Sequence, residues 1–137
     1  DAYKSHEFPF EIECVVEPKP LGTGGAIKNA LSHTKSDPVL ILNGDSYVDF
    51  NLADLMAVHV RNESPFSMVL TQVPDTSRYG RVEFDEDSFC INNFSEKKAG
   101  MGKGWINAGV SLIRKKLLQK NPWIVAPVLR VIIPIYH

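Results

Sequence analysis

The feature that most constrains the fold of this chain is a short, uninterrupted apolar run, Val39-Leu-Ile-Leu42, which lies between Pro38 and Gly44. Four consecutive apolar residues between turn-forming residues are typical of a strand buried on both faces, as in a parallel sheet. Helix-like and strand-like segments alternate along much of the chain. This order predicts an α/β fold with right-handed crossovers, in which helices flank a Rossmann-like mixed, mostly parallel sheet.

Residue patterns also set the expected bounds of the other elements. Alternation and short apolar runs predict strands at residues 10–16, 67–73, 82–85, 89–94 and 105–113. Helical spacing predicts helices at residues 26–31, 52–59 and 114–120. Thr23 is the expected N-cap of the first helix, and Asn51 or Asp49 that of the second. No structure is predicted for the proline-interrupted tail, so we expect a single partial domain over residues 1–137 with an unassigned tail at 121–137.

Composition excludes several classes of protein. The 137 residues suffice for a compact domain with an apolar core, and the formal net charge of -1 favours neither nucleic acid nor an acidic membrane surface. No apolar stretch is long enough to span a bilayer, and no secretory signal is recognisable. Cys14 and Cys90 fit neither a disulfide framework nor a metal site. Their apolar surroundings predict buried thiols in a reducing cytoplasm.

The first motif that bears on chemistry is the glycine-rich segment Glu17-Pro-Lys-Pro-Leu-Gly-Thr-Gly-Gly-Ala-Ile27. A glycine-rich turn between a strand and a helix lets the backbone approach a ligand closely, and a helix N-terminus favours anions. The spacing matches neither the dinucleotide-binding nor the Walker pattern. By itself, the segment fits a tight strand-to-helix turn equally well.

The second motif is Leu42-Asn-Gly-Asp45, which follows the apolar run directly. A carboxylate just past the end of a buried strand lies where α/β folds place ligands. Mg²⁺ takes few protein carboxylates and keeps positions for phosphate oxygens, so Asp45 is a candidate metal ligand. Asn-Gly and Gly-Asp also form turns, and a plain turn is the alternative.

The third set of motifs comprises Arg78-Tyr-Gly80, Glu96-Lys97 and Ile106-Asn-Ala-Gly-Val110. A Glu and a Lys at a strand end suit a sugar hydroxyl and a phosphate respectively. The amide of Asn107 offers both a donor and an acceptor to hydroxyl groups. Taken singly, Glu96 and Lys97 also fit a solvated pair, and Asn107 also fits a turn. No nucleophile elbow or cysteine–histidine pair indicates covalent catalysis.

Taken together, five segments resemble successive blocks of the sugar-phosphate nucleotidyltransferase family. They read EPKPLGTGGAI, LNGDSYVD, SRYGRVEFD, FSEK and INAGVSLI, and the resemblance covers about residues 10–118. The blocks are most similar to those of guanylyltransferases that act on heptose or mannose 1-phosphate. The resemblance implies the nucleotide-diphospho-sugar transferase type of fold. It also implies the transfer of a nucleoside monophosphate to a sugar 1-phosphate, with release of pyrophosphate and with Mg²⁺ as cofactor.

The resemblance further implies a role for each matching residue. It assigns nucleotide binding to Glu17, Leu21, Gly22 and Gly25, and it assigns Mg²⁺ to Asp45. It assigns the sugar and its phosphate to Tyr79, Gly80, Glu96, Lys97, Asn107 and Gly109. The implied partners are a nucleoside triphosphate and a sugar 1-phosphate, without nucleic acid or membrane, and a homo-oligomer is allowed.

The side chain of Glu17 favours GTP among the nucleotides. Guanine presents two neighbouring N–H donors on its pairing edge, and an ionised Glu, which only accepts hydrogen bonds, can take both. Uracil and thymine present an acceptor beside a donor, which suits Gln better. Because a hydrogen bond to a charged group contributes about 1.5–3 kcal/mol, this residue predicts a preference for GTP.

The sequence departs from the family pattern in two places. The Gly-x-Gly-x-Arg-Leu loop that supplies the main catalytic Arg and Lys in the family is absent, so no residue of this chain is assigned as catalytic. A second metal-binding Asp beyond the Asn-Ala-Gly block has no counterpart in the tail. We therefore expect an incomplete domain that is inactive and poorly stable by itself, because sheet edges and apolar faces would be left open.

Three interpretations remain open from the sequence. The first is a nucleotide-sugar pyrophosphorylase. The second is a non-catalytic module of the same fold that binds a sugar nucleotide or regulates a partner, and the third is a generic α/β domain with chance motifs. A Gly-rich loop with Arg and Lys encoded upstream of Asp1 would favour the first, and a true start at Asp1 would favour the second.

Overall fold

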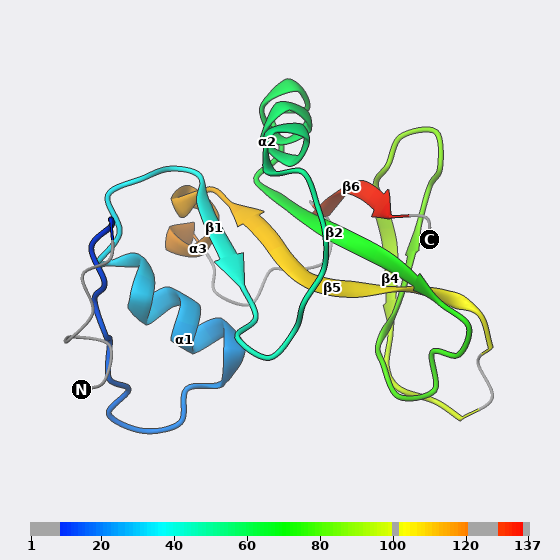
Figure 1. Cartoon of the computed structure of the whole chain (residues 1–137), viewed down its shortest axis with the longest axis horizontal. Helices are drawn as coiled ribbons and strands as arrows, with labels where there is room; N and C mark the ends of the chain where they lie inside the picture. The colour runs from blue at the N-terminus through cyan, green and yellow to red at the C-terminus, as the bar shows by residue number, and fades with distance from the viewer. Residues whose placement is uncertain (1–8, 100–101, 121–128, 136–137) are drawn as a thin grey trace. The chain divides into compact units, whose positions relative to one another are not determined.

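A computed structural model describes residues 9–99, 102–120 and 129–135 (Figure 1). The chain divides into two compact units, Asp1–Lys35 and Ser36–His137. The first unit contains helix α1 (Gly22–Leu31). The second contains helices α2 (Leu52–Arg61) and α3 (Lys115–Lys120) and strands β1 (Val39–Leu42), β2 (Phe66–Val73), β3 (Arg81–Phe84), β4 (Ile91–Ser95), β5 (Gly104–Ile113) and β6 (Leu129–Ile135).

The described strands form one six-stranded sheet in the second unit, and β5 is its central strand. The order is β4-β3-β5-β2-β6, and β1 pairs with β5 as well. Strand β2 pairs with both halves of β5 along one edge. Consequently β1 and β3 share the other edge, where β1 faces residues 110–113 and β3 faces residues 105–106.

The sequence predicts a mostly parallel sheet, and this prediction is wrong for the described strands. Among their pairings only β2–β6 is parallel, whereas β1–β5, β2–β5, β3–β4 and β3–β5 are antiparallel. Strands β1 and β2 do run in the same direction and are connected through α2, as the alternation of elements indicates. However, β5 lies between them and runs the opposite way. The order of elements cannot reveal this insertion, because β5 comes later in the chain.

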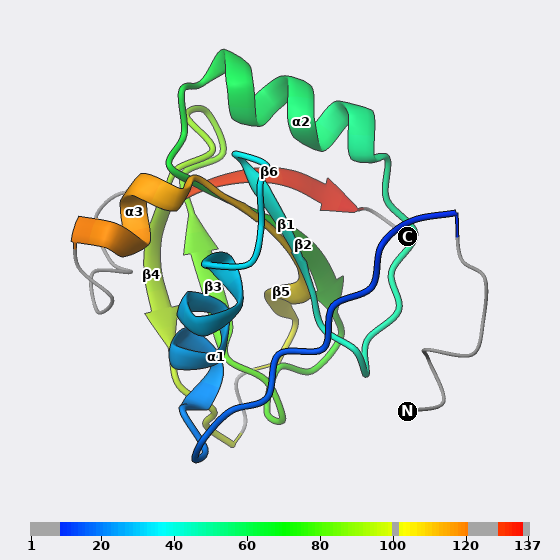
Figure 2. The same cartoon turned by 90° about the vertical axis from the view of Figure 1, so that its left-hand side faces the viewer.

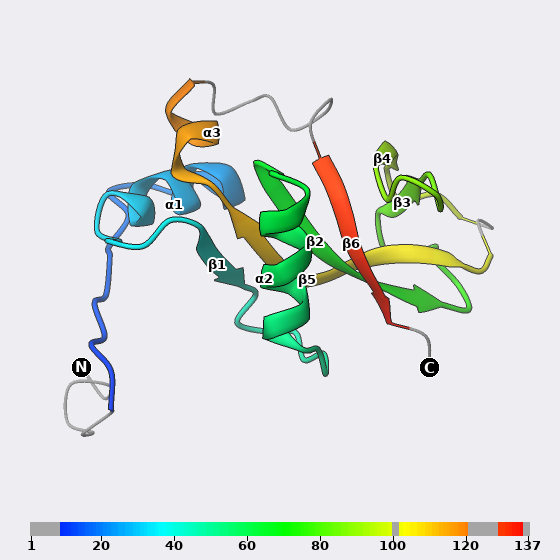
Figure 3. The ribbon, with the colours of Figure 1, turned by 90° about the horizontal axis from the view of Figure 1, so that it is seen from above.

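Apolar side chains cover both faces of the sheet. Helix α2 lies along one face of the sheet and contacts β2, β5 and β6 (Figures 2 and 3). There Leu55 packs against Val69 of β2 and against Ala108, Val110 and Leu112 of β5. Because successive side chains of a strand point to opposite faces, Met68 and Leu70 belong to the other face. There they form a second cluster with Val82 and Ile91.

Most of the predicted elements of the second unit are confirmed. The strands predicted at 67–73, 82–85, 89–94 and 105–113 correspond to β2–β5, and the helices predicted at 52–59 and 114–120 correspond to α2 and α3. Asn51 caps α2, since its Oδ1 accepts from the Ala53 and Asp54 N–H groups at 2.9 and 3.3 Å. Strand β6 was not expected, and residues 121–128 and 136–137 lie outside the described residues.

Two burial predictions are wrong. Strand β1 is not buried on both faces in the described structure, because its first three residues are half-buried and Leu42 is 57% exposed. Cys14 is exposed and Cys90 is half-buried, so neither is a buried thiol.

No described helix is both long enough and apolar enough to cross a membrane.

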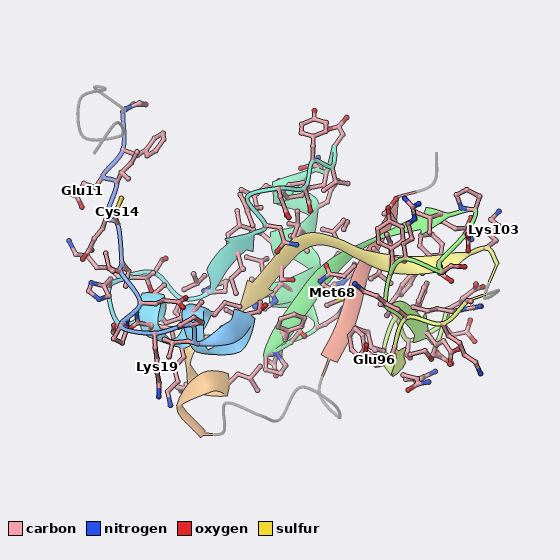
Figure 4. The ribbon with its side chains drawn as sticks, turned by 90° about the horizontal axis from the view of Figure 1, so that it is seen from below. Glu11, Cys14, Lys19, Met68, Glu96 and Lys103 are labelled. Atoms are coloured by element: carbon pink, nitrogen blue, oxygen red, sulfur yellow. The ribbon has the colours of Figure 1, made fainter. Side chains whose placement is uncertain are left out.

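The strand predicted at residues 10–16 is absent from the described structure. This segment carries Glu11 and Cys14 along an extended path without a strand ladder (Figure 4). Its apolar side chains remain exposed, with Phe10 at 63% and Val16 at 85%. Alternation identifies a segment that is able to form a strand, but a strand also needs a partner, and no described segment pairs with this one.

His59 is a buried histidine on the inner side of α2. Its side chain is fully buried, and its Nδ1 shares a 2.7 Å hydrogen bond with Ser67 Oγ of β2. Among the described residues, its Nε2 has no hydrogen-bond partner. Burial lowers the pKa of His59 below its usual 6.5, and the Arg114 guanidinium lowers it further, against a smaller opposite effect of Asp37. His59 therefore packs as a neutral ring.

We expect this histidine to make the protein less stable as the pH falls below 6.5. Between 6.5 and the lower pKa of folded His59, the unfolded chain binds more protons than the folded one, so stability rises with pH in this window. The contribution is complete above pH 6.5 and is lost as the pH falls through the folded pKa. Thermal midpoints between about pH 7.5 and 5 check this. His59→Gln, which cannot titrate, should have a flatter profile, and an unchanged profile would contradict the assignment.

Candidate functional site

Strand β5 bulges where the Asn-Ala-Gly motif lies. Its register with β2 shifts between the pairs Met68↔Ser111 and Leu70↔Asn107. Gly109 in the bulge has a φ of +83°, in the left-handed region that favours glycine. The Gly109 N–H donates to Asn107 Oδ1 at 2.9 Å. The side chain of Asn107 thus closes the bulge, and the group that it can still offer as a donor is its Nδ2.

The loop that carries Asp45 (residues 43–51, the Asp45 loop) is attached to this bulge. The Asn43 N–H donates to the Gly109 carbonyl at 2.8 Å. A Cβ on Gly109 would lie 3.0 Å from Asn43 Nδ2 and 3.1 Å from the Cβ atoms of Asn43 and Ser46. The absence of a side chain at Gly109 therefore lets the loop lie directly against β5. Asp45 itself is exposed, and its Oδ1 accepts from Ser46 Oγ at 3.3 Å.

The bulge lies in a gap between two strands on the same edge of β5. Strand β1 ends at Leu42, which pairs with Val110, and β3 begins at Arg81, which pairs with Ile106. Residues 107–109 are left between them. The Asp45 loop leaves β1 on one side of this gap, and the Tyr79-Gly80 segment enters β3 on the other.

The ends of β3 and β4 bring two more motifs to this gap. Arg81 pairs with Ser95 of β4 as well as with Ile106 of β5, so these three residues lie side by side across the three strands. One residue further along lie Gly80, Glu96 and Asn107. A Cβ on Gly80 would lie at an ordinary 3.5 Å from the Ser95 carbonyl oxygen. Glu96 (Figure 4) and its neighbour Lys97 are exposed just past the end of β4.

The segment before Gly80 is held by a buried threonine. Thr76 is fully buried, and its N–H and Oγ1 donate to the Gly102 carbonyl at 2.9 and 3.1 Å. The Tyr79 N–H donates to the Thr76 carbonyl at 2.9 Å. Hydrogen bonds from Ser77 to the Asp75 carboxylate lower the pKa of Asp75 and close the same turn. Tyr79 itself is 45% exposed.

The four predicted nucleotide-binding residues lie in one turn of the first unit. Glu17 is half-buried, and its Oε2 accepts from the Leu21 N–H at 3.0 Å. Helix α1 begins at Gly22, whose φ is +68°, and so Thr23 lies inside the helix and the prediction of Thr23 as N-cap is wrong. A Cβ on Gly25 would lie 2.7 Å from Leu21 Cβ, so this position needs glycine for the turn to lie against the helix.

Residues 2–121 match the family described as nucleotidyl transferase, which is most of the chain. The chain belongs to the nucleotidyl transferase family. The resemblance of its five sequence blocks to sugar-phosphate nucleotidyltransferases is thereby confirmed.

Curated nucleotidyl transferases similar to this chain include two guanylyltransferases. D-glycero-alpha-D-manno-heptose 1-phosphate guanylyltransferase of Campylobacter jejuni is 36% identical over 115 residues, which cover 84% of this chain and 49% of that protein. Mannose-1-phosphate guanylyltransferase catalytic subunit beta of Drosophila pseudoobscura is 34% identical over 106 residues, which cover 76% of this chain and 28% of that protein. The chain thus spans half or less of the length of these relatives.

A solved structure supports the same relationship. HddC from Yersinia pseudotuberculosis, in a crystal structure described as complexed with GMP-PN, superposes with a TM-score of 0.80 at 27% sequence identity. The superposition covers 98% of this chain and 62% of HddC. The fold described above is therefore shared with HddC.

The structure brings some of the predicted site residues together and leaves others apart. Gly80, Glu96, Asn107, Gly109 and the Asp45 loop meet around the gap on β5, and Tyr79 and Lys97 adjoin them in sequence. The nucleotide-binding set, Glu17, Leu21, Gly22 and Gly25, belongs to the first unit. Within this nucleotidyl transferase chain, each set is therefore a local cluster of its own.

The donor set around Asp45 fits a Mg²⁺ that is shared with phosphates. Within the described ranges, no three His, Cys, Asp or Glu side chains gather into a protein-only metal site. Mg²⁺ commonly binds one or two carboxylates and completes its shell with water and substrate phosphates. A single exposed carboxylate at a strand end suits this second kind of site.

Sequence reasoning missed the residues that support the site. Asn43, Ser46 and Thr76 hold the two loops beside the gap, yet none of them was singled out. Asn43 does lie within the Leu42-Asn-Gly-Asp45 motif, but a residue type alone does not indicate a contact with Gly109. The local sequence signal that fits the bulge is the glycine at position 109, because a bulge residue with positive φ favours glycine.

Proposed function

We propose that the protein transfers GMP from GTP to a sugar 1-phosphate and gives a nucleotide-sugar and pyrophosphate. The observation that carries this proposal is the convergence, on one edge of β5, of a loop with an exposed carboxylate and of the segments that contain Gly80, Glu96 and Asn107. Donors and acceptors of this kind suit a hydroxylated, phosphorylated ligand. The names of the relatives support a guanine nucleotide and a heptose or mannose 1-phosphate as substrates.

In the proposed reaction, a phosphate oxygen of the sugar 1-phosphate attacks the α-phosphorus of GTP. The bond to the bridging oxygen of the β-phosphate breaks, and pyrophosphate leaves in line with the attack. Catalysis then depends on alignment and on neutralising negative charge, without a covalent enzyme intermediate. Lys97 would meet the sugar phosphate, Glu96 and the Nδ2 of Asn107 would orient sugar hydroxyls, and the Tyr79 ring would lie along the sugar.

Mg²⁺ held by Asp45 would supply charge neutralisation at the phosphates. Glu17 would accept hydrogen bonds from guanine through its Oε1, because its Oε2 already accepts from Leu21. The backbone of Leu21, Gly22 and Gly25 would frame the base. The proposal thus assigns the base to the glycine-rich turn of the first unit and, separately, the sugar phosphate to the gap on β5 in the second unit.

An activity panel tests the proposal. The full-length gene product is assayed for pyrophosphate release with GTP, dTTP, UTP and CTP, each combined with mannose, heptose and glucose 1-phosphates. We expect kcat/KM for GTP to exceed that for dTTP by at least about tenfold, which is the discrimination expected from one hydrogen bond to a charged group. A preference for dTTP would contradict the base assignment. Binding of GTP without pyrophosphate release would favour a non-catalytic module.

The 137-residue chain is assayed beside the full-length product. We propose that it does not turn over alone, because the phosphate-wrapping Arg and Lys implied by the family resemblance have no counterpart among its residues. Turnover by this chain at a rate comparable to that of the full-length product would contradict this.

A further inference from the structure

Asn43 makes contacts that the proposed substrate roles do not use. Its N–H bonds to the Gly109 carbonyl, and its side chain covers the Cα of Gly109, where an added Cβ would meet Asn43 Nδ2 and Cβ at 3.0 and 3.1 Å. Asn43 is two residues before Asp45 in the chain, whereas Gly109 is two residues after Asn107. One contact therefore joins the carboxylate loop to the segment that faces the sugar.

This contact attaches the first half of the Asp45 loop to the sheet. Among the described residues of the loop, from Asn43 to the α2 cap Asn51, only Asn43 forms a hydrogen bond with the sheet. In the second half, Val48 and Phe50 pack against the core cluster beneath α2. Asp45 lies between these two attachments, so its position follows from both.

The other side of the contact is held by buried neighbours and by hydrogen bonds. Ala108 and Val110, which flank Gly109, are buried in the core cluster with Leu55. The Gly109 N–H is fixed on Asn107 Oδ1, and the Gly109 carbonyl is fixed on the Asn43 N–H. Both backbone polar groups of Gly109 are thus hydrogen-bonded, the N–H to the proposed sugar-binding residue Asn107 and the carbonyl to the loop that carries Asp45.

We propose that Asn43 and Gly109 are paired positioning residues that fix the Asp45 carboxylate relative to Asn107. This inference rests on the proposed function, since it concerns how the metal-binding loop is held. Its consequence is that changes at Gly109 disturb both the divalent cation and the sugar 1-phosphate. A change at Asn43 disturbs the cation more than the sugar, because the bond between Gly109 and Asn107 stays intact.

The test measures Mn²⁺ binding in the presence of GTP by electron paramagnetic resonance of the free ion, together with kcat and KM, in the full-length gene product. Gly109→Ala is expected to weaken Mn²⁺ binding about tenfold, as loss of an outer support of a metal ligand does, and to raise KM for the sugar 1-phosphate several-fold. Asn43→Ala removes the side chain that covers Gly109 but keeps the backbone N–H bond, so it is expected to weaken Mn²⁺ binding a few-fold, less than Gly109→Ala does, with little change in that KM. The double variant should lose less than the product of the two effects, because both act through one contact.

Gly44→Ala is the matched control. It adds a methyl group in the same loop where nothing lies within 4 Å, so Mn²⁺ binding should stay within about twofold of wild type. If Gly109→Ala fails to fold by circular dichroism, Asn43→Ala, which adds no atom, decides the question. Variants that bind Mn²⁺ like wild type would overturn this inference while leaving the proposed function in place. A wild type that turns over no substrate and binds no Mn²⁺ with GTP would overturn the proposed function itself.

Discussion

Replacing Asp45 by Asn is expected to lower kcat of the full-length gene product by at least about a hundredfold. The substitution keeps the shape of the side chain but removes the negative charge that would hold the divalent cation. Loss of an outer support of a metal ligand costs about 10–100-fold, so loss of a direct ligand should cost no less. Because Asp45 is exposed and accepts only from Ser46 among the described residues, the fold should tolerate the change.

Asp49→Asn is the control for this substitution. It makes the same chemical change on an exposed carboxylate of the same loop, and the cap of α2 is Asn51 rather than Asp49. Activity is measured by pyrophosphate release over a range of Mg²⁺ concentrations, and thermal midpoints are measured in parallel. Asp45→Asn with activity within tenfold of Asp49→Asn at saturating Mg²⁺ would show that Asp45 is not the ligand.

The elements that sequence patterns predicted correctly are those whose periodicity reflects a buried face. Leu55 and His59 lie at helical spacing because that face of α2 packs on the sheet, and residues 105–113 are mostly apolar because β5 is central. The direction of β5 has no such signature. Buried parallel and buried antiparallel strands are both apolar, so the sequence order suggested a parallel sheet that the pairing does not have.

Exposed or weakly patterned segments were predicted less well for a related reason. Residues 10–16 alternate like a strand, but alternation carries no information on whether a partner strand is present. Strand β6 was missed because Pro134 interrupts its pattern. Pro134 is tolerated because β6 is the last strand in the sheet order, where a missing N–H need not face a neighbour.

In the candidate site, too, some residues could be nominated from the sequence and others could not. Residues that would touch the substrates, such as Asp45 and Asn107, were predictable because their chemistry is visible in the residue type and in the motif. The resemblance already named Gly109 for the sugar, but the positioning roles of Asn43 and Gly109 depend on a hydrogen bond between the loop after β1 and strand β5, which no residue pattern indicates. Likewise, only the structure shows that Asn107 Oδ1 accepts from the Gly109 N–H, so that the Nδ2 group of Asn107 is left to donate to a ligand.

Glu17→Gln is expected to lower kcat/KM for GTP by about ten- to a hundredfold and to raise dTTP relative to GTP. In the protein, Glu17 Oε2 accepts from the Leu21 N–H at 3.0 Å, which leaves Oε1 for the base. A Gln must keep its oxygen on that N–H, since two donors cannot bond, and so its NH₂ group takes the place of Oε1. That group repels the N–H donors of guanine but suits a carbonyl of thymine. A lost hydrogen bond to a charged group costs about 1.5–3 kcal/mol, which gives the expected range.

The matched control is Glu13→Gln, which makes the same change on an exposed Glu of the same unit whose partner is His33. It should leave the ratio of kcat/KM for GTP and dTTP unchanged. Glu17→Ala separates base reading from support of the turn, because it removes the bond to Leu21 without presenting a donor to the base. It should therefore reduce activity with both nucleotides and shift the ratio less than Glu17→Gln does. If Glu17→Gln and Glu17→Ala shift the ratio equally, Glu17 supports the turn through Leu21 but does not read the base.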